Sequence, residues 1–389
     1  MDLLIILICL CAPAALLTPW NNLASATDFP NYYAAARMIA SGHFATAYDV
    51  NMIGPLENQF FPDLKGRVLP FLLCPALAWC CLPLAALPYR QAFATWTVFL
   101  FASLVCAFFL FSHVFRLSRR ERLWAAAILG TSGPCLETLR IGQPSTIFLL
   151  GLALLAYGLK NDRSLAAACG QSVFWLKPHI LLPLIFFEAG RGLISIPTVT
   201  GLIGIGGIVV AVLLGGSGVI NSYYHLLSSH QAQLYMGLSY GPTLRALLIN
   251  LLPGFGSDLL VLAVYALVPI FAFLIGRIYQ QRQTTLLLQL LAVVLPVSLV
   301  LSPHLHNYDL LLLFPGIVGV FAMRSSKSQV QSMRVVAGLL ACLLSLPIYI
   351  LGHYFYVLRG GVFNPFFIGT CIWAIVAVQC LGKLPDESR

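Results

Sequence analysis

Asp28 is the first residue of this sequence whose type and position could do chemistry. It stands in the longest polar interval of an otherwise apolar chain, residues 20–68, and belongs to the run Thr27-Asp28-Phe29-Pro30. A carboxylate at the face of a membrane could act as a general base that takes a proton from an attacking hydroxyl. Alternatively, Asp28 only caps the short helix that the next residues predict, because Asp is a favoured N-cap and Pro30 falls in the first turn. The stretch by itself leaves both interpretations open.

Further polar and ionisable residues stand at or beside the ends of apolar runs, where their desolvation is costly. Asp309 heads such a run and needs a partner, which Lys177 or Arg140 could provide. The two cations could equally be residues that extend their charged ends toward the membrane surface. Together, cations that hold a phosphate and a carboxylate that takes a proton suit an anionic, lipid-borne substrate. The candidate binding residues are Arg140, Gln143, Lys177, His179, Arg245, His306, Tyr308 and Asp309.

Signals for a metal or another cofactor are weak. His304 and His306 form an i, i+2 pair without a settled third ligand, which is poor support for a metal site. The sequence has eleven cysteines but no C-x-x-C pair, so we expect them mostly as small buried hydrophobic residues. We expect no cofactor, and a divalent metal is disfavoured without being excluded.

Composition determines which elements must position these residues. The chain has 389 residues, 59% of them hydrophobic and 9% charged, whereas soluble domains carry about 25% charged residues. We therefore expect an all-α polytopic membrane protein that forms a single domain over residues 1–389, with no repeat and no linker. The net charge of +9 is attributed to membrane-flanking loops, because no basic cluster interleaved with aromatic residues supports nucleic-acid binding. The expected spans, twelve in number, are 3–19, 91–115, 123–140, 145–160, 164–177, 179–190, 194–214, 257–276, 284–302, 308–322, 335–352 and 363–381.

Charge in the loops predicts which side each loop faces. The expected spans place 14 of the 22 basic residues on one side of the membrane, which is therefore the cytoplasmic side. Both chain termini lie on this side as well. This requires that residues 20–90 stay outside as a long first loop with amphipathic juxtamembrane helices, one of them starting at Asp28 and ending at Gly42. Residues 69–88, interrupted by four prolines, are expected as a broken helix in or on the outer leaflet, and 215–256 as a second outer loop. Residues 243–252 are too short to span. Irregular backbone at membrane depth must be covered by protein or line a water-filled cavity. We therefore expect an outward-facing cavity that is covered by the first loop.

Four motifs in this order and spacing carry a resemblance to a known family. They are Asp28 with Tyr32-Tyr33, Gly42 and Tyr48-Asp49; Pro83-Leu84-Ala85-Ala86-Leu87-Pro88-Tyr89 with Trp96; Gly142-Gln143-Pro144 running on to Lys177-Pro178; and Ser302-Pro303 with Tyr308-Asp309. Over roughly residues 25–320 the chain resembles glycosyltransferase family 87, the polyprenyl-phosphate-mannose-dependent mannosyltransferase-like membrane proteins of GT-C architecture. One departure is Val68-Leu69-Pro70, where the family often has Tyr-Pro-Pro, in a segment expected to line the donor site.

The resemblance implies a function and assigns roles. It implies that Asp28 is the catalytic base, and that an active site facing the periplasm, or outside, of a bacterial inner (plasma) membrane transfers a sugar with inversion. The sugar, mannose or another hexose or pentose, would come from polyprenyl phosphate and pass to a lipid- or glycan-type acceptor among the membrane lipids. Lys177, Arg140 or His306 would meet the leaving phosphate. No D-x-D, G-x-G-x-x-G or P-loop motif occurs, which disfavours a nucleotide-sugar donor.

Two other functions remain as alternatives. A transporter or flippase of lipid-linked glycans is disfavoured because the chain shows none of the internal symmetry that transporters often have. A polymerase or ligase of lipid-linked glycans would use a diphosphate donor, and a requirement for an oligosaccharide would distinguish it.

Overall fold

The computed structural model describes residues 28–229, 241–252, 257–278, 280, 286–325, 327–353, 356 and 364–381. This part of the chain is helical, and its only β-type pairing is an isolated bridge between Ser132 and Ser345. The all-α prediction is therefore confirmed for the described residues. The expected span 3–19 lies outside them.

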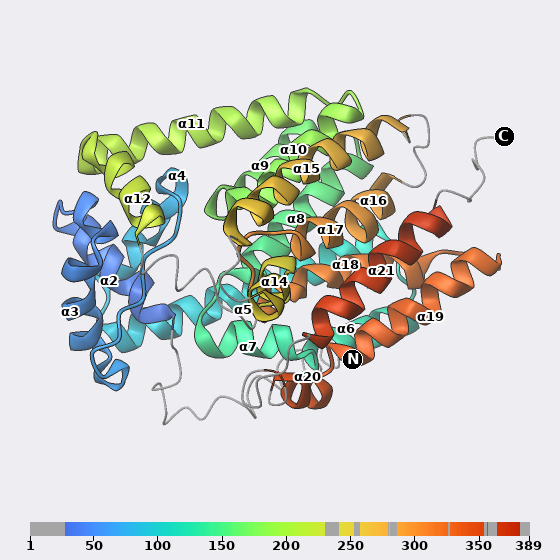
Figure 1. Cartoon of the computed structure of the whole chain (residues 1–389), viewed down its shortest axis with the longest axis horizontal. Coiled ribbons are helices and arrows are strands. Elements are labelled where there is room, and N and C mark those ends of the chain that lie inside the picture. Colours follow the sequence, from blue (N-terminus) through green and yellow to red (C-terminus); the bar gives the residue numbers. More distant parts are fainter. Residues whose placement is uncertain are drawn as a thin grey trace.

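Two groups of helices make up the structure (Figure 1). The first, here called the N-terminal unit, has its own apolar core around Phe29, Tyr33 and Phe44. It comprises α2 (Phe29–Ala40), η2 (Ala45–Tyr48), α3 (Val50–Phe60), η3 (Pro62–Leu64), α4 (Pro75–Ala78), η4 (Trp79–Ala86) and α12 (Gly218–Ser228).

The second group, here called the helical bundle, holds the larger apolar core and lies beside the N-terminal unit (Figure 1). Its helices are α5 (Tyr89–Val114), α6 (Arg119–Gly130), α7 (Gly133–Ile141), α8 (Ser145–Lys160), α9 (Ser164–Ser172), η5 (Val173–Leu176), α10 (Pro178–Gly190), α11 (Ser195–Gly215), α14 (Leu244–Leu251), α15 (Ser257–Ile278), α16 (Leu286–Gln289), the π-helical η7 (Leu290–Val294), α17 (Leu295–Val300), η8 (Asn307–Leu313), α18 (Phe314–Ala322), α19 (Ser328–Leu343), α20 (Leu346–His353) and α21 (Pro365–Leu381).

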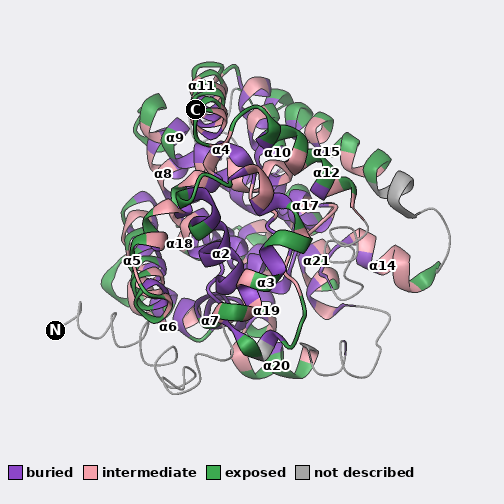
Figure 2. Ribbon diagram, turned by 90° about the vertical axis from the view of Figure 1, so that its left-hand side faces the viewer, coloured by how far each residue is buried: buried purple, intermediate pink, exposed green. Residues whose placement is uncertain are grey.

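Helix α2 is buried on nearly every side, which corrects the expectation of an amphipathic helix on the membrane surface. Within it only Arg37 and Ala40 are exposed, and Figure 2 shows most of the helix in the purple of buried residues. Its aromatic residues explain this, since Phe29 contacts the rings of Tyr89 and Phe93 at the start of α5. The helix start at Asp28 is fixed on the bundle as a result.

Several expected spans match helices of the bundle closely. Spans 91–115, 145–160, 179–190, 194–214 and 257–276 correspond to α5, α8, α10, α11 and α15 within two residues. Small residues permit close approach of α8 and α9, because a Cβ added to Gly170 would lie only 2.4 Å from the carbonyl oxygen of Gly151.

Two expected spans are each broken into a pair of helices. Span 123–140 is α6 and α7, and span 335–352 falls on α19 and α20, with breaks at Ser132-Gly133-Pro134 and Ser345-Leu346-Pro347. In both, a proline stands in the first turn of the second helix, where it needs no N–H partner. The breaks pair with each other, since Gly133 N–H donates to Leu344 O at 2.8 Å and Leu346 N–H to Thr131 O at 2.9 Å.

Two helices among the described residues, α5 and α11, are long and apolar enough to cross a membrane. Other apolar helices have 10–17 residues, among them α8, α10 and α21. Twelve membrane spans therefore stay a prediction. In the stretch 69–88, expected as a helix broken by prolines, residues 69–74 are not helical, and α4 runs directly into the 3-10 helix η4 over residues 75–86.

Candidate active site

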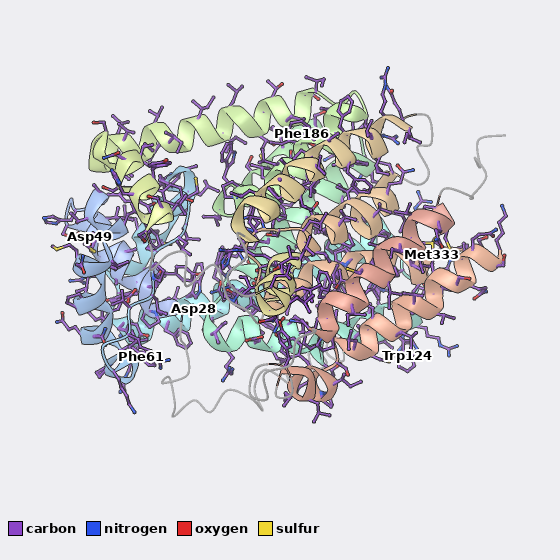
Figure 3. The ribbon with its side chains drawn as sticks, in the orientation of Figure 1. Asp28, Asp49, Phe61, Trp124, Phe186 and Met333 are labelled. Carbon is purple, nitrogen blue, oxygen red and sulfur yellow. The ribbon has the colours of Figure 1, made fainter. Side chains whose placement is uncertain are left out.

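Asp28 lies where the N-terminal unit meets the bundle (Figure 3). It occupies the N-cap position of α2, but its side chain makes no capping hydrogen bond, so the expectation that the carboxylate itself caps the helix is wrong. Instead its Oδ2 accepts a hydrogen bond from Gln143 Nε2 at 2.5 Å. The carboxylate is only 8% exposed, yet it lines a cavity. Its orientation is set by a residue of the bundle rather than by its own helix.

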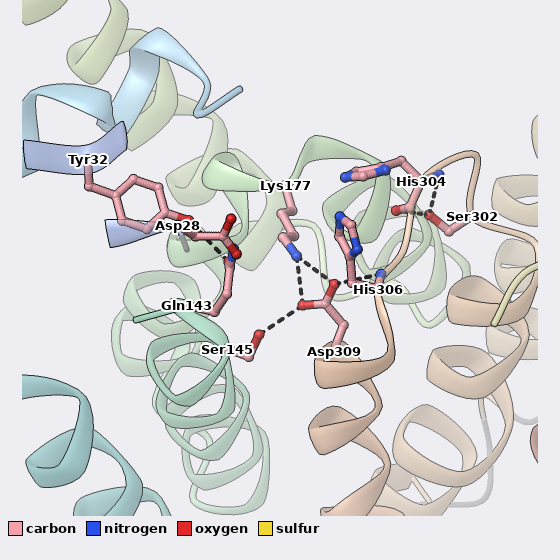
Figure 4. Close-up of polar contacts among 9 residues, drawn as sticks. All are labelled: Asp28, Tyr32, Gln143, Ser145, Lys177, Ser302, His304, His306 and Asp309. Carbon is pink, nitrogen blue, oxygen red and sulfur yellow. Dashed lines mark hydrogen bonds and ion pairs between the residues drawn. The ribbon is translucent and has the colours of Figure 1, made fainter. Parts of the chain in front are cut away.

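Gln143 connects Asp28 to a tyrosine of the same helix (Figure 4). Its Oε1 accepts a hydrogen bond from Tyr32 Oη at 3.1 Å while its Nε2 donates to Asp28. Burial first, and then the nearby Asp28, raises the pKa of Tyr32 well above its usual value, so the phenol stays protonated and donates. The Gln143 amide therefore has its oxygen toward Tyr32 and its NH₂ group toward Asp28.

The turn before Gln143 depends on glycine. Gly142 ends α7 with φ +79°, and a Cβ there would lie 3.0 Å from Cβ of Phe29. Its carbonyl oxygen accepts a hydrogen bond from Trp96 Nε1 at 2.7 Å. The motif Gly142-Gln143-Pro144 therefore turns the chain tightly against the start of α2 and presents the Gln143 side chain to Asp28.

A second carboxylate lies on the other side of Lys177 (Figure 4). Asp309 is fully buried, and Lys177 Nζ lies 2.6 Å from each of its carboxylate oxygens. Ser145 Oγ donates to Oδ1 at 2.9 Å, and the backbone N–H of His306 donates to Oδ2 at 3.3 Å. Of the two cations expected to pair with Asp309, the structure places Lys177 there. The pairing neutralises Asp309, so Asp28 is the carboxylate that the cavity presents.

Three histidines gather beside this ion pair. The ring of His304 lies 4.8 Å from that of His306 and 6.3 Å from that of His179, measured between centroids. Burial first, and then His304 and Lys177, lowers the pKa of His306 well below its usual value. A positive charge on His306 is therefore disfavoured. No group of three or more His, Cys, Asp or Glu side chains suited to a metal occurs among the described residues.

A cavity of about 380 Å³ separates Asp28 from these residues. Six of the nine site residues predicted from the sequence line it: Asp28, Gln143, Lys177, His179, Arg245 and Tyr308. Asp309 and His306 are buried behind the lining. The structure does not bring Arg140 to this cavity, because its side chain is exposed at the last turn of α7.

Several residues of the site are not among the nine predicted from the sequence. Asn31 and Tyr32 line the cavity, and Ser145 supports Asp309 from the first turn of α8. Leu69 and Pro70 were not missed: their segment was expected to line the donor site, and both residues line the cavity. Asn31 lies one turn after Asp28, and Ser145 lies two residues after Gln143. The closeness of Asn31 and Ser145 in sequence to predicted site residues could have indicated that they belong to the site.

Comparison with known proteins agrees with the resemblance drawn from the motifs. The family model for glycosyltransferase family 87 matches residues 71–303, more than half of the chain. No curated protein and no solved structure matches the chain. The chain therefore belongs to glycosyltransferase family 87, and this membership together with the apolar helices indicates a membrane protein with glycosyltransferase activity.

Proposed function

We propose that this member of glycosyltransferase family 87 transfers a sugar, mannose or another hexose or pentose, from a polyprenyl-phosphate donor to a lipid- or glycan-type acceptor. The observation that carries the proposal is a single cavity whose lining combines the carboxylate of Asp28, the cations Lys177 and Arg245, and a set of leucines. Each of these groups suits one part of the reaction.

Asp28 is the general base in this account. A sugar joined to phosphate through its anomeric carbon needs an attacking hydroxyl on the opposite face, and a carboxylate there removes the hydroxyl proton as the new bond forms. The C–O bond to phosphate breaks in the same step, so the configuration at the anomeric carbon inverts. Gln143 holds the carboxylate in place by donating to Oδ2.

Lys177 and Arg245 stabilise the negative charge that grows on the leaving phosphate. Lys177 Nζ contacts both carboxylate oxygens of Asp309 and has three N–H donors. The Lys177 side chain is 12% exposed and lines the cavity, so it can also contact a phosphate there. Arg245 is held over the cavity by donating from Nη1 to Pro303 O at 3.4 Å. Fixed cations that act on developing charge are among the most effective catalytic devices.

The rest of the lining suits an apolar chain attached to the phosphate. Its leucines come from the N-terminal unit and from helices of the bundle, and α15 contributes Leu262. Burial of apolar carbon stabilises the bound state by roughly 0.8 kcal/mol per CH₂ group. The charge distribution in the loops supports a cavity that opens to the outer face of the plasma membrane, with both chain termini in the cytoplasm.

A panel of sugar donors tests the proposal. Isolated membranes containing the protein are supplied with polyprenyl-phosphate sugars, polyprenyl-diphosphate sugars and nucleotide sugars, each with an acceptor-rich lipid extract. We expect transfer from a polyprenyl-phosphate sugar with inverted anomeric configuration. Transfer only from a diphosphate or a nucleotide donor would contradict the proposal, as would no transfer by folded protein from any donor.

A further inference from the structure

One wall of the cavity is an extended segment whose backbone is held by side chains. Residues 67–74 form neither helix nor strand, which Pro70 helps to explain because it lacks an N–H and disfavours helix at the residue before it. Asn58 accepts from Gly66 N–H at 2.7 Å and donates to Arg67 O at 3.0 Å. Tyr48 Oη donates to Leu73 O at 3.0 Å.

Between these two anchors, Leu69 is bound through both of its backbone polar groups. Its N–H donates to Glu57 Oε2 at 2.9 Å, and its carbonyl oxygen accepts from Asn31 Nδ2. The same Nδ2 donates to Glu57 Oε1 at 3.1 Å. Glu57 is fully buried, so these contacts are shielded from water. Leu69 itself lines the cavity, which makes this cluster part of its wall.

The cluster determines which end of the Asn31 amide faces the cavity. A backbone carbonyl oxygen can only accept, so Leu69 O requires the NH₂ end of Asn31, and this holds in either protonation state of Glu57. The two N–H donors of Asn31 are then directed at Leu69 and Glu57. No described side chain or backbone group donates to Oδ1 of Asn31, and Asn31 is a lining residue. The amide oxygen is therefore the polar atom that Asn31 offers to a ligand.

The position of this oxygen points to the ligand it would bind. Asn31 follows Asp28 by one helical turn, its backbone N–H donating to Asp28 O at 3.2 Å, and both side chains line the same cavity. A hydrogen-bond acceptor beside the base suits a second hydroxyl of the molecule whose first hydroxyl the base deprotonates. We propose that Asn31 Oδ1 binds a hydroxyl of a polyhydroxylated acceptor, a glycan or polyol head group, and that Glu57 is the positioning residue that orients the amide. This inference rests on the proposed function.

Transfer kinetics test the inference. The full-length protein in membranes is given the polyprenyl-phosphate sugar that the donor panel selects, with increasing amounts of the acceptor lipid extract. We expect Asn31→Ala to raise the half-saturating amount of acceptor by about three- to tenfold, the effect of losing one hydrogen bond. We expect the half-saturating concentration of the sugar donor to stay within about twofold of the wild-type value. Thermal unfolding verifies that each variant is folded.

Glu57→Leu, which removes both acceptor oxygens at similar volume, tests the positioning role. We expect it to weaken acceptor use in the same way, and to add nothing when it is combined with Asn31→Ala, because both changes remove one interaction. Asn58→Ala is the matched control, since it loosens the same segment without touching Asn31. The inference would be overturned if Asn58→Ala lost acceptor use equally, or if the effects of the two substitutions added in the double variant. It would also be overturned if the half-saturating concentration of the sugar donor changed, or if acceptor dependence stayed as in wild type. If wild type transfers no sugar at all, the proposed function fails instead.

Discussion

At the scale of residues, the two carboxylates of the site have different surroundings and therefore different roles. Asp309 is fully buried and bound by Lys177, Ser145 and the backbone of His306, whereas Asp28 lines the cavity beside Gln143. Removing water from an ion pair is costly, and the pair persists because its members satisfy each other. Asp309 thus holds Lys177 in place, and in the proposed mechanism Asp28 is the carboxylate that takes the proton.

A pair of substitutions separates support from catalysis. Lys177→Met leaves the Asp309 carboxylate buried without its counter-ion, and we expect a loss of about 3–5 kcal/mol in the free energy of unfolding. Adding Asp309→Asn removes the uncompensated charge and should restore most of that stability, as measured by thermal unfolding. We expect sugar transfer to stay low in the double variant, because the phosphate still lacks the Lys177 cation. Recovery of transfer along with stability would limit Lys177 to a structural role.

Some of these residues could be predicted from the sequence and others could not. Gln143, Lys177 and Asp309 stand at or beside the ends of apolar runs, where burying a polar or ionisable group is costly and suggests a function. Asp28 was found differently, as the first residue of a predicted helix in the longest polar interval of the chain. Glu57 gave no such signal, because its partners Asn31 and Leu69 lie 26 residues before and 12 residues after it and meet it only in the folded chain. Arg140 was expected in the site because it also ends an apolar run, but the end of α7 turns its side chain outward.

At the scale of elements, the turn between α7 and α8 positions the site and supplies a sharp prediction. Gly142→Ala places a side chain at φ +79° and brings its Cβ to 3.0 Å from Phe29 Cβ. Gly42→Ala is the matched control, because it has the same φ of +79° but no atom within 4 Å of the added Cβ. We expect both to lose about 1–2 kcal/mol of stability for the left-handed backbone. Only Gly142→Ala should also lower the transfer rate, by displacing Gln143 from Asp28.

Equal transfer rates for these two variants would show that Gly142 provides only backbone conformation. The rates are compared in membranes at matched amounts of folded protein.

Glu57, in helix α3, should make the stability of the protein depend on pH. Burial raises the pKa of Glu57 to about 8, despite hydrogen bonds from Leu69 and Asn31 that act in the opposite direction. The folded state then holds a proton that the unfolded state has released, so the stability contributed by this proton falls as pH rises from about 4.5 through 8. We expect the unfolding temperature of wild type to fall between pH 6 and pH 9 relative to that of Glu57→Gln. Parallel curves for the two proteins would contradict this.

Helix boundaries were predictable where hydrophobic runs are uninterrupted, and less so elsewhere. Runs such as 145–160 predicted α8 directly, whereas the breaks at Ser132 and Ser345 divide runs that hydrophobicity alone reads as continuous. Each break has the pattern Ser-x-Pro, which is a helix-start signal even within an apolar run. Their mutual pairing is a tertiary contact between distant residues, and no local pattern indicates it. The burial of α2 likewise depends on aromatic partners in α5.

At the scale of the whole molecule, the proposed topology places the N-terminal unit and the basic turns on opposite sides of the membrane. Arg37 is exposed on the N-terminal unit, and Arg120 is exposed at the start of α6. In intact spheroplasts we expect a membrane-impermeant maleimide to modify Arg37→Cys but not Arg120→Cys, with mass spectrometry assigning the labelled peptides. Both should react after the membrane is permeabilised. Labelling of Arg120→Cys from outside would reverse the proposed orientation.

The most direct test of the central claim compares sugar-donor binding with sugar transfer in Asp28→Asn. Asparagine keeps an oxygen that can accept from Gln143 but loses the basicity of the carboxylate. We predict that binding of the polyprenyl-phosphate sugar stays within about twofold of wild type while transfer falls by a factor of about 100 or more, the usual contribution of a general base. Full transfer by Asp28→Asn, or a loss that follows entirely from weaker donor binding, would contradict the assignment of Asp28 as the base.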